Sequence, residues 1–295
     1  MTVQGELALD GLPARLFTCT PTRLTTWLDC PRRYRFTYLD RPQPPKGLPW
    51  AHNSLGSAVH LALAGWYRLV PSARTPPAAG RLLDQAWMHE GFRNDEQSAH
   101  WRDRARDMVT RYAGTLDPDD EPPGIERTVA TRTDVLAVSG RIDRIDRLDR
   151  RAVDGAEQLV VVDYKTGRRL LTAYDARSSL ALALYALAVT RTFRRPCLRV
   201  ELHHLPTGDV VGHDHTPETL QRHLDRAESV GSEAAAAEVA YKAAPDSDAA
   251  SDAADVRFPA QVSAACRWCD FLRVCPAGSS AHTPAEPWAA LGSAD

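Results

Sequence analysis

Cysteines placed near opposite ends of the chain constrain its fold more than any other feature. Cys30 lies near the beginning, and Cys266, Cys269 and Cys275 follow one another near the end in a Cys-x2-Cys-x5-Cys pattern. A Cys-x2-Cys step lets two thiolates bind one metal from a tight turn. With Cys30 added, a four-thiolate site would join segments that are 235 residues apart. We therefore expect one domain over residues 1–276, closed at both ends by this site.

The spacing of the cysteines leaves the metal open, because four thiolates suit either tetrahedral zinc or an iron–sulfur cluster. In the alternative interpretation Cys30 is an unrelated helix thiol and the other three are inert, but their density in a cysteine-poor chain disfavours it. Trp268 and Phe271 are expected to cover the site with apolar surface. Cys19 and Cys197 match no ligand spacing and are predicted to be buried thiols.

Composition and net charge indicate where the protein is expected to be found and what kind of partner it can bind. The net charge of the 295-residue chain is −2, so any nucleic-acid partner needs a local basic groove. No apolar run approaches the length of a membrane span, and no basic region followed by an apolar stretch opens the chain. We therefore expect a cytoplasmic protein without membrane contact, in which cysteines more often serve metals or catalysis than disulfides.

Hydrophobic periodicity predicts an α/β fold with a helical N-terminal portion. Ser139-Gly140 is interpreted as the turn of a hairpin, residues 233–257 as an Ala/Asp-rich linker or loop, and residues 277–295 as a polar tail. Helices are expected near 20–38, 54–69, 80–93, 97–116, 178–192 and 217–233, and strands near 126–137, 141–148, 158–164, 198–205 and 210–213.

An apolar run that ends in Asp163-Tyr164-Lys165 carries the candidate chemistry. Residues two apart on a strand point to the same face, so the side chains of Asp163 and Lys165 converge at the strand end. Asp143 lies in the preceding strand and reaches the same place if the two strands pair as a hairpin. Asp146, three residues further on, is expected to face the other way.

Two carboxylates on adjacent strands form an oxygen site suited to Mg²⁺ or Mn²⁺, which polarises phosphoryl oxygens and activates water. A lysine beside them can orient that water and offset negative charge. Lys165 is one of only three lysines among 36 basic residues, which favours a chemical requirement for it. The alternative is a surface Asp–Lys pair, but the apolar run and Gly140-x-x-Asp143 upstream favour function.

Further candidates are individually weaker. His60 lies on an apolar helix, where a lone histidine is most often a core residue, although as a ligand it would add one nitrogen to the carboxylate site. Tyr185 is either a core aromatic or a catalytic-site residue that packs beside the site or contacts the substrate. Four arginines of the first helix either contact phosphates or form a solvated face: Arg23, Arg32, Arg33 and Arg35.

Taken in order, these motifs resemble the RecB-like branch of the PD-(D/E)xK nuclease superfamily. The chain is especially similar to stand-alone RecB-family exonucleases, CRISPR-associated RecB-like exonucleases and the AddB nuclease domain. The resemblance runs from about residue 20 to residue 276. It is carried by 22–31 with Cys30, by 56–60 with His60, by 140–146 with Asp143, by 162–167 with Asp163 and Lys165, and by Cys266, Cys269 and Cys275.

The resemblance implies a restriction-endonuclease-like mixed sheet flanked by helices. It implies that His60, Asp143, Asp163 and the backbone carbonyl of Tyr164 bind the divalent ion and that Lys165 is the catalytic lysine. It also implies that the four cysteines hold a [4Fe-4S] cluster that pins the ends of the fold. The family usually has Gln four residues before the tyrosine that corresponds to Tyr185, where this chain has Ala181.

The sequence therefore predicts a Mg²⁺- or Mn²⁺-dependent DNA exonuclease that acts on single-stranded ends in repair or recombination. The alternatives are a non-catalytic iron–sulfur DNA-binding module, supported by Ala181, a CRISPR adaptation nuclease working with other adaptation proteins, and a zinc-stabilised protein without nuclease function. The chain has no Gly-Lys-Ser/Thr nucleotide-binding loop, so ATP-driven unwinding would require a helicase partner.

Overall fold

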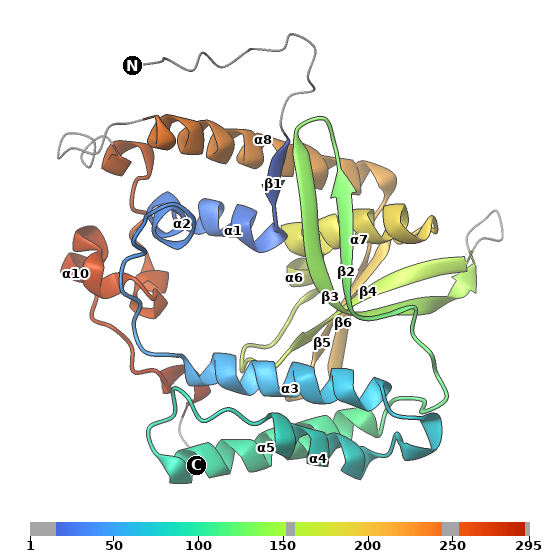
Figure 1. Ribbon diagram of the computed structural model, residues 1–295. Helices are drawn as coiled ribbons and strands as arrows, with labels where there is room; N and C mark the ends of the chain where they lie inside the picture. The colour runs from blue at the N-terminus through green and yellow to red at the C-terminus, as the bar shows by residue number, and fades with distance from the viewer. Residues whose placement is uncertain (1–15, 152–156, 244–253, 293–295) are drawn as a thin grey trace, which may run out of the picture.

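A mixed β-sheet forms the centre of the molecule (Figure 1). The computed structural model describes residues 16–151, 157–243 and 254–292. Within these residues the sheet has six strands in the order β1-β3-β4-β5-β6, with β2 also paired to β3. The strands are β1 (Phe17–Cys19), β2 (Gly124–Arg132), β3 (Leu136–Arg151), β4 (Glu157–Lys165), β5 (Arg199–His204) and β6 (Asp209–Asp214).

Strand β3 organises the sheet. It pairs in parallel with β1 and antiparallel with both β2 and β4, and β4 in turn pairs in parallel with β5. Strands β5 and β6 form an antiparallel pair, as the predicted hairpin requires. The predicted α/β architecture with a mixed sheet is therefore confirmed.

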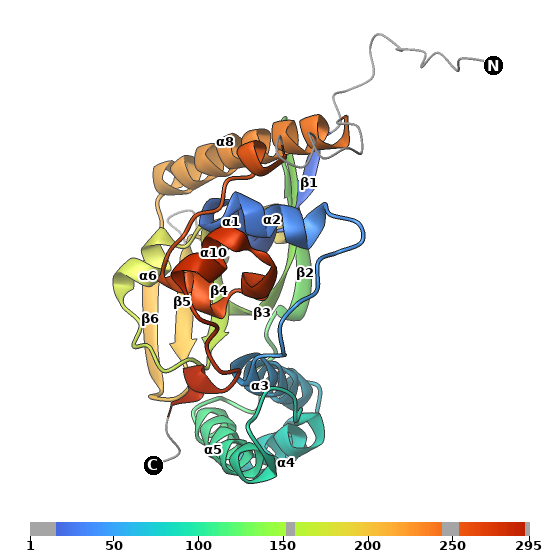
Figure 2. The same cartoon turned by 90° about the vertical axis from the view of Figure 1, so that its left-hand side faces the viewer.

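Helices cover both faces of this sheet (Figures 1 and 2). Helices α3, α4 and α5 form one layer, α7 lies on the opposite face, and α1 and α8 pack against α7. No helix of the described ranges is both long and apolar enough to cross a membrane. The helices are α1 (Pro21–Asp29), α2 (Pro31–Tyr38), α3 (Ala51–Tyr67), α4 (Pro76–Ala86), α5 (Asp95–Ala113), α6 (Ala173–Ser178), α7 (Leu180–Phe193), α8 (Pro217–Lys242) and α10 (Pro276–Ala281).

Strand β4 is apolar on both faces because both are covered. Val160 and Val162 belong to the core shared with α3 and α5, whereas Leu159 and Val161 belong to the core shared with α7. All four side chains are buried. A continuous apolar run is typical of a strand between two helical layers, and this run places Asp163 and Lys165 at the end of a rigid element.

The first predicted helix is two helices. Thr20 caps α1 by accepting a hydrogen bond from the Arg23 backbone N–H at 3.1 Å. Cys30 has extended backbone (φ −168°, ψ 109°), and Pro31 occupies the first position of α2. A proline lacks a backbone N–H and disfavours helical geometry in the residue before it, so the helix ends and restarts here. Cys30 consequently lies at a junction between helices rather than inside one.

The predicted turn at Ser139-Gly140 is wrong. Both residues lie within β3, and the chain turns at residues 133–135, where the Thr133 hydroxyl accepts hydrogen bonds from the backbone of Val135 and Leu136. A Cβ atom on Gly140 would lie 2.6 Å from Cε1 of Tyr185. This glycine therefore permits close approach of an aromatic ring to the strand, a common reason for glycine inside a sheet.

The predicted linker at 233–257 is wrong over its first part, since α8 continues to Lys242. Alanine favours helix strongly, and Val230, Ala234 and Glu238 form a buried stripe along α8. Residues 244–253 lie outside the described residues. The segment predicted as a polar tail packs on the domain, because Leu291 is buried in the core with α3 and the carbonyl of Pro287 accepts a hydrogen bond from the start of α3.

Candidate active site

A cavity of about 1140 Å³ lies between the start of α1, one face of α3, strands β2 to β4, and α7. The side of α3 that lines it repeats every three or four residues, as one face of a helix does, from His52 through His60 to Arg68. Asp143, Tyr164, Lys165 and Tyr185 also line this cavity, whereas Asp163 lines a smaller one beside it. The fold thus brings the predicted site residues from four elements to one region.

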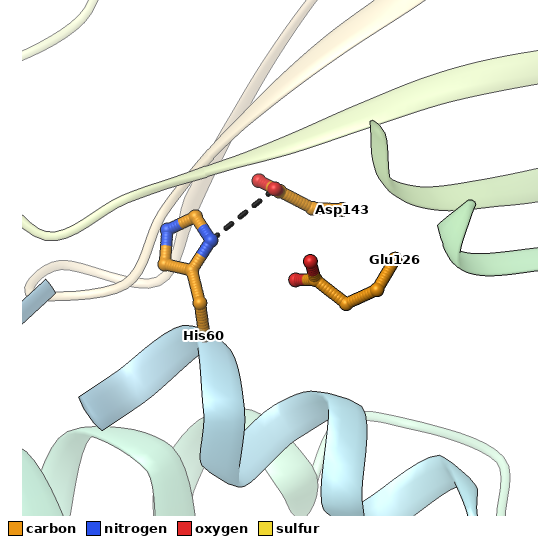
Figure 3. Close-up of side chains that lie close together, drawn as sticks. All are labelled: His60, Glu126 and Asp143. Atoms are coloured by element: carbon orange, nitrogen blue, oxygen red, sulfur yellow. Dashed lines mark hydrogen bonds and ion pairs between the residues drawn. The ribbon is translucent and has the colours of Figure 1, made fainter. Parts of the chain in front are cut away.

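Asp143 connects α3 to β4. Its Oδ1 lies 3.2 Å from Nδ1 of His60 (Figure 3). Its Oδ2 accepts a hydrogen bond of 2.8 Å from the backbone N–H of Tyr164. His60 is also in edge contact with the Tyr164 ring at 5.7 Å between centroids. His60 therefore lies against the site and is not an ordinary core histidine.

The register of the sheet places three carboxylates in a row. Arg144 of β3 is paired with Val162 of β4 in antiparallel register. Asp143 precedes Arg144 and Asp163 follows Val162, so the two carboxylates face one another across β3 and β4. On the other side, Glu126 of β2 stands opposite Asp143, between the paired residues on either side of it. Motif reasoning missed Glu126, because nothing in its local sequence distinguishes it and only the pairing of β2 with β3 places it.

Glu126 rather than Asp163 completes the closest group of potential metal ligands. One ligand atom each from His60, Glu126 and Asp143 lies within 4.8 Å of the others, the only such group of three His, Cys, Asp or Glu side chains among the described residues. Figure 3 shows the Glu126 carboxylate and the His60 ring directed toward the same space as Asp143. One nitrogen and two carboxylates form a donor set suited to a divalent cation.

Asp163 and Lys165 form an ion pair, with Nζ of Lys165 2.5 Å from Oδ2 of Asp163. Their side chains thus lie on the same side of β4, as strand alternation predicts. The Lys165 side chain is 46% exposed and reaches the large cavity, whereas that of Asp163 is only 24% exposed. A partly free ammonium beside a sheltered carboxylate is available to contact a phosphate or a water molecule.

The ionisable groups of this site show the effect of crowded negative charge. Burial raises the pKa of Asp163, although Lys165 opposes the shift. Burial and then the charge of Asp143 raise the pKa of Glu126. Burial lowers the pKa of His60, but the hydrogen bond and charge of Asp143 outweigh it, so this pKa lies above its usual value. The site therefore favours the binding of positive charge.

Arg144 forms a separate polar network on the opposite side of β3. Its Nη1 donates to the hydroxyls of Tyr67, Tyr112 and Tyr164 at 2.9–3.2 Å, and its Nε lies 2.7 Å from a carboxylate oxygen of Asp146. Asp146 therefore faces away from the cavity, as the sequence predicts. This network holds the Tyr164 ring from behind while the Tyr164 backbone binds Asp143.

Tyr185 and Ala181 lie on α7 next to Asp163. Tyr185 lines the large cavity and packs against Gly140. Burial raises the pKa of Tyr185, and the charges of Asp163 and Asp143 raise it further. Ala181 lines a cavity of about 300 Å³ that Asp163 and Lys165 also line. Space therefore exists beside the site at Ala181, the position for which the family resemblance led us to expect glutamine.

The four cysteines line another cavity, of about 220 Å³, which within the described residues shares no lining residue with the two cavities at the candidate active site. Backbone N–H groups approach two of the sulfurs: those of Arg33 and Gln261 lie 3.5 and 3.4 Å from the sulfur of Cys30, and that of Ser263 lies 3.5 Å from the sulfur of Cys266. The sulfurs that line it belong to Cys30, Cys266, Cys269 and Cys275.

The two aromatic residues expected to cover the cysteines differ in position. Phe271 is buried and lines the cysteine cavity, as predicted. Trp268 does not line it and is 36% exposed, with its ring 5.5 Å from that of Trp50 at the start of α3. The two cysteines outside the pattern, Cys19 and Cys197, are both buried, as expected.

Most of the arginines in the first two helices are structural. Arg23 pairs with Glu238 of α8. Arg32 and Arg35 both pair with Asp255, at 2.9 and 2.8 Å, and both are largely buried. These contacts hold α1 and α2 against the C-terminal part of the chain, so these three arginines are not available as a phosphate-binding row.

The family profile of the PD-(D/E)XK nuclease superfamily matches residues 18–276, and the chain belongs to this superfamily. A search of curated proteins finds no match. Among solved structures, the chain is similar to a protein from Eubacterium rectale that is provisionally named an exonuclease. The identity is 10%, the TM-score is 0.33, and the similarity covers 72% of this chain and 94% of that one.

Proposed function

We propose that the protein is a divalent-metal-dependent exodeoxyribonuclease that acts on single-stranded DNA ends in repair or recombination. The observation that carries the proposal is the convergence of His60, Asp143, Asp163 and Lys165 on one region in a member of a nuclease superfamily. The helix α3 supplies the histidine, and adjacent strands supply the rest.

His60, Asp143 and Asp163, with the backbone carbonyl of Tyr164, would hold a Mg²⁺ or Mn²⁺ ion. The donor set fits, because the site combines one nitrogen with carboxylates that face each other across β3 and β4. When bound, such an ion polarises a phosphoryl oxygen and lowers the pKa of bound water. The backbone N–H of Tyr164 holds one oxygen of Asp143, which leaves the other directed at His60.

We assign to Lys165 the direct contact with the substrate. Its ammonium group contacts Asp163 and reaches the cavity, where it can orient a water molecule and offset charge on the scissile phosphate. Arg68 and Arg141 line the same cavity and supply further positive charge for backbone phosphates. The cavity, of about 1140 Å³, has room for a few nucleotides of one strand beside Lys165.

We assign a [4Fe-4S] cluster to Cys30, Cys266, Cys269 and Cys275. All four thiols line one cavity, and N–H groups near the sulfurs suit thiolate ligands. Visible absorbance and iron content distinguish the cluster from tetrahedral zinc, which four thiolates also suit.

The test is a time course on end-labelled single-stranded DNA with Mg²⁺, Mn²⁺ or EDTA. Anaerobically purified wild type is compared with Lys165→Ala, and Lys242→Ala on α8 is the matched control. We expect metal-dependent shortening by the wild type and Lys242→Ala, and little by Lys165→Ala. Cleavage by Lys165→Ala at the wild-type rate would contradict the mechanism. DNA binding without cleavage under any metal would favour the non-catalytic module suggested by Ala181.

A further inference from the structure

Glu126 is the one carboxylate of the row across β2, β3 and β4 that no motif marks. We propose that Glu126 binds the divalent cation directly, together with His60 and Asp143. The ion would then take ligands from α3, β2 and β3 as well as from β4. This inference rests on the proposed metal-dependent nuclease function and adds a ligand to it.

The geometry requires little movement. The ligand atoms of His60, Glu126 and Asp143 already lie within 4.8 Å of one another. Ligands of one Mg²⁺ ion, each at about 2.1 Å, are separated by about 3–4 Å. A small rotation of the Glu126 side chain, which points into this space in Figure 3, closes the difference.

The backbone of Glu126 is unusual for its residue type. Its φ of 47° lies in the left-handed region, although the residue is neither glycine nor asparagine. The neighbours Ile125 and Arg127 keep their pairing with β3 on either side, so β2 departs from regular geometry at this residue alone. Strained conformations of this kind persist where the surrounding structure enforces them, and they cluster at sites of function.

The charges around Glu126 favour a cation. Asp143 faces it across the strands, and two sheltered carboxylates repel one another unless positive charge lies between them. Arg141 is its ion-pair partner, at 2.9 Å, but the Arg141 side chain is 71% exposed. Solvent screens the exposed guanidinium, so Arg141 offsets only part of the negative charge of Glu126 and Asp143.

Binding of Mn²⁺, measured by electron paramagnetic resonance without DNA, tests this inference directly. The protein retains its cysteine-bound metal, and the variants are Glu126→Gln, Glu126→Asp and, as a matched control at the far end of β4, Glu157→Gln. We expect affinity to fall about tenfold or more in Glu126→Gln. Glu126→Asp keeps the charge but shortens the reach, so its affinity should also fall, whereas Glu157→Gln should bind as the wild type does.

Thermal melting without added divalent ions, with the cysteine-bound metal retained, separates ligation from a structural role. Because the Glu126 carboxylate repels Asp143 when no divalent ion is bound, Glu126→Gln should melt at or above the wild-type temperature while binding Mn²⁺ more weakly. Unchanged Mn²⁺ affinity in Glu126→Gln would overturn the inference. Wild-type affinity in Glu126→Asp alone would also overturn direct ligation and leave only a long-range charge effect. A wild type that binds no Mn²⁺ would instead reject the proposed function itself.

Discussion

The active site and the four-cysteine cavity are positioned by different means. The active-site residues project from α3 and from three paired strands, whose backbone hydrogen bonds fix their relative positions. The cysteines lie at a junction between two helices and around the short 3-10 helices Ala264–Trp268 and Leu272–Val274. The geometry of the first region is therefore fixed by regular secondary structure, whereas that of the second would, on our proposal, depend on the metal bound by the four thiolates.

The two regions are nevertheless connected. The carbonyl of Asp270 accepts a hydrogen bond of 2.7 Å from the backbone of Gly47, and the Asp270 carboxylate accepts one of 2.7 Å from the indole of Trp50. Both donors precede α3, the helix that carries His60. Loss of order around the cysteines would thus reach the candidate active site through the start of α3.

The largest expected effect comes from Asp163→Asn. We expect cleavage to fall by about 10³-fold or more, because the change removes a candidate metal ligand and the partner of Lys165. Thermal stability should stay the same or rise, since burial already disfavours the charged form of Asp163. Cleavage rates and melting curves check this together, and a large loss of stability would erase the contrast between the two regions.

Cys269→Ser should have the opposite effects: a large loss of stability and little direct effect on cleavage. We expect loss of bound iron and a fall of about 4 kcal/mol or more in the free energy of unfolding, as for other losses of structural metal. Activity should fall only as a consequence of unfolding. Iron content, visible absorbance and melting temperature are the measurements, with Cys19→Ala as the control that keeps its iron. A stable, active protein without metal would show that the cysteine region is not ligand-dependent.

A pH titration distinguishes structural carboxylates from those of the active site. The hydrogen bond with His203 holds the pKa of Glu201 at about 2, below its usual value, and Arg199 adds to the effect. Its stabilising contribution, about 3 kcal/mol, is fully present above pH about 4.5 and is lost as the pH falls toward about 2. Stability of Glu201→Gln should therefore vary less with pH in this window. An unchanged pH profile would contradict the assignment.

Ala181→Gln should have the smallest effect. The cavity of about 300 Å³ beside Ala181, Asp163 and Lys165 has room for the longer side chain. We expect the variant to melt within a few degrees of the wild type and to cleave DNA as fast or up to several-fold faster. Steady-state kinetics on single-stranded DNA check this, and a marked loss of activity would show that the cavity serves the substrate instead.

Much of the fold follows from local sequence. The apolar run of β4 and the hairpin of β5 and β6 were predictable because they depend on neighbours in the chain. Gly140 misled the prediction because a glycine signals either a turn or a close contact, and the contact with Tyr185 comes from a distant helix. Residues 233–242 were misassigned because an alanine-rich helix has few large apolar residues to reveal its period.

The candidate site was predictable only where motifs carry it. Asp163 and Lys165 share a strand, so their common direction follows from alternation alone. Asp143 was proposed from the expected pairing of adjacent strands, whereas His60 was a weak candidate until the family resemblance supported it, and the structure places them 3.2 Å apart. Glu126 was beyond reach because its position depends on the register of β2 against β3 and on an unusual backbone angle.

Alternation along β3 also has a meaning for how such a protein can diverge. Asp143 faces the cavity, while the adjacent Arg144 holds three tyrosine hydroxyls on the other side of the sheet. Adjacent positions of one strand are thus under different constraints: Asp143 is constrained by the site, and Arg144 is constrained by folding. Specificity can drift on the cavity side while the tyrosine network keeps the scaffold constant.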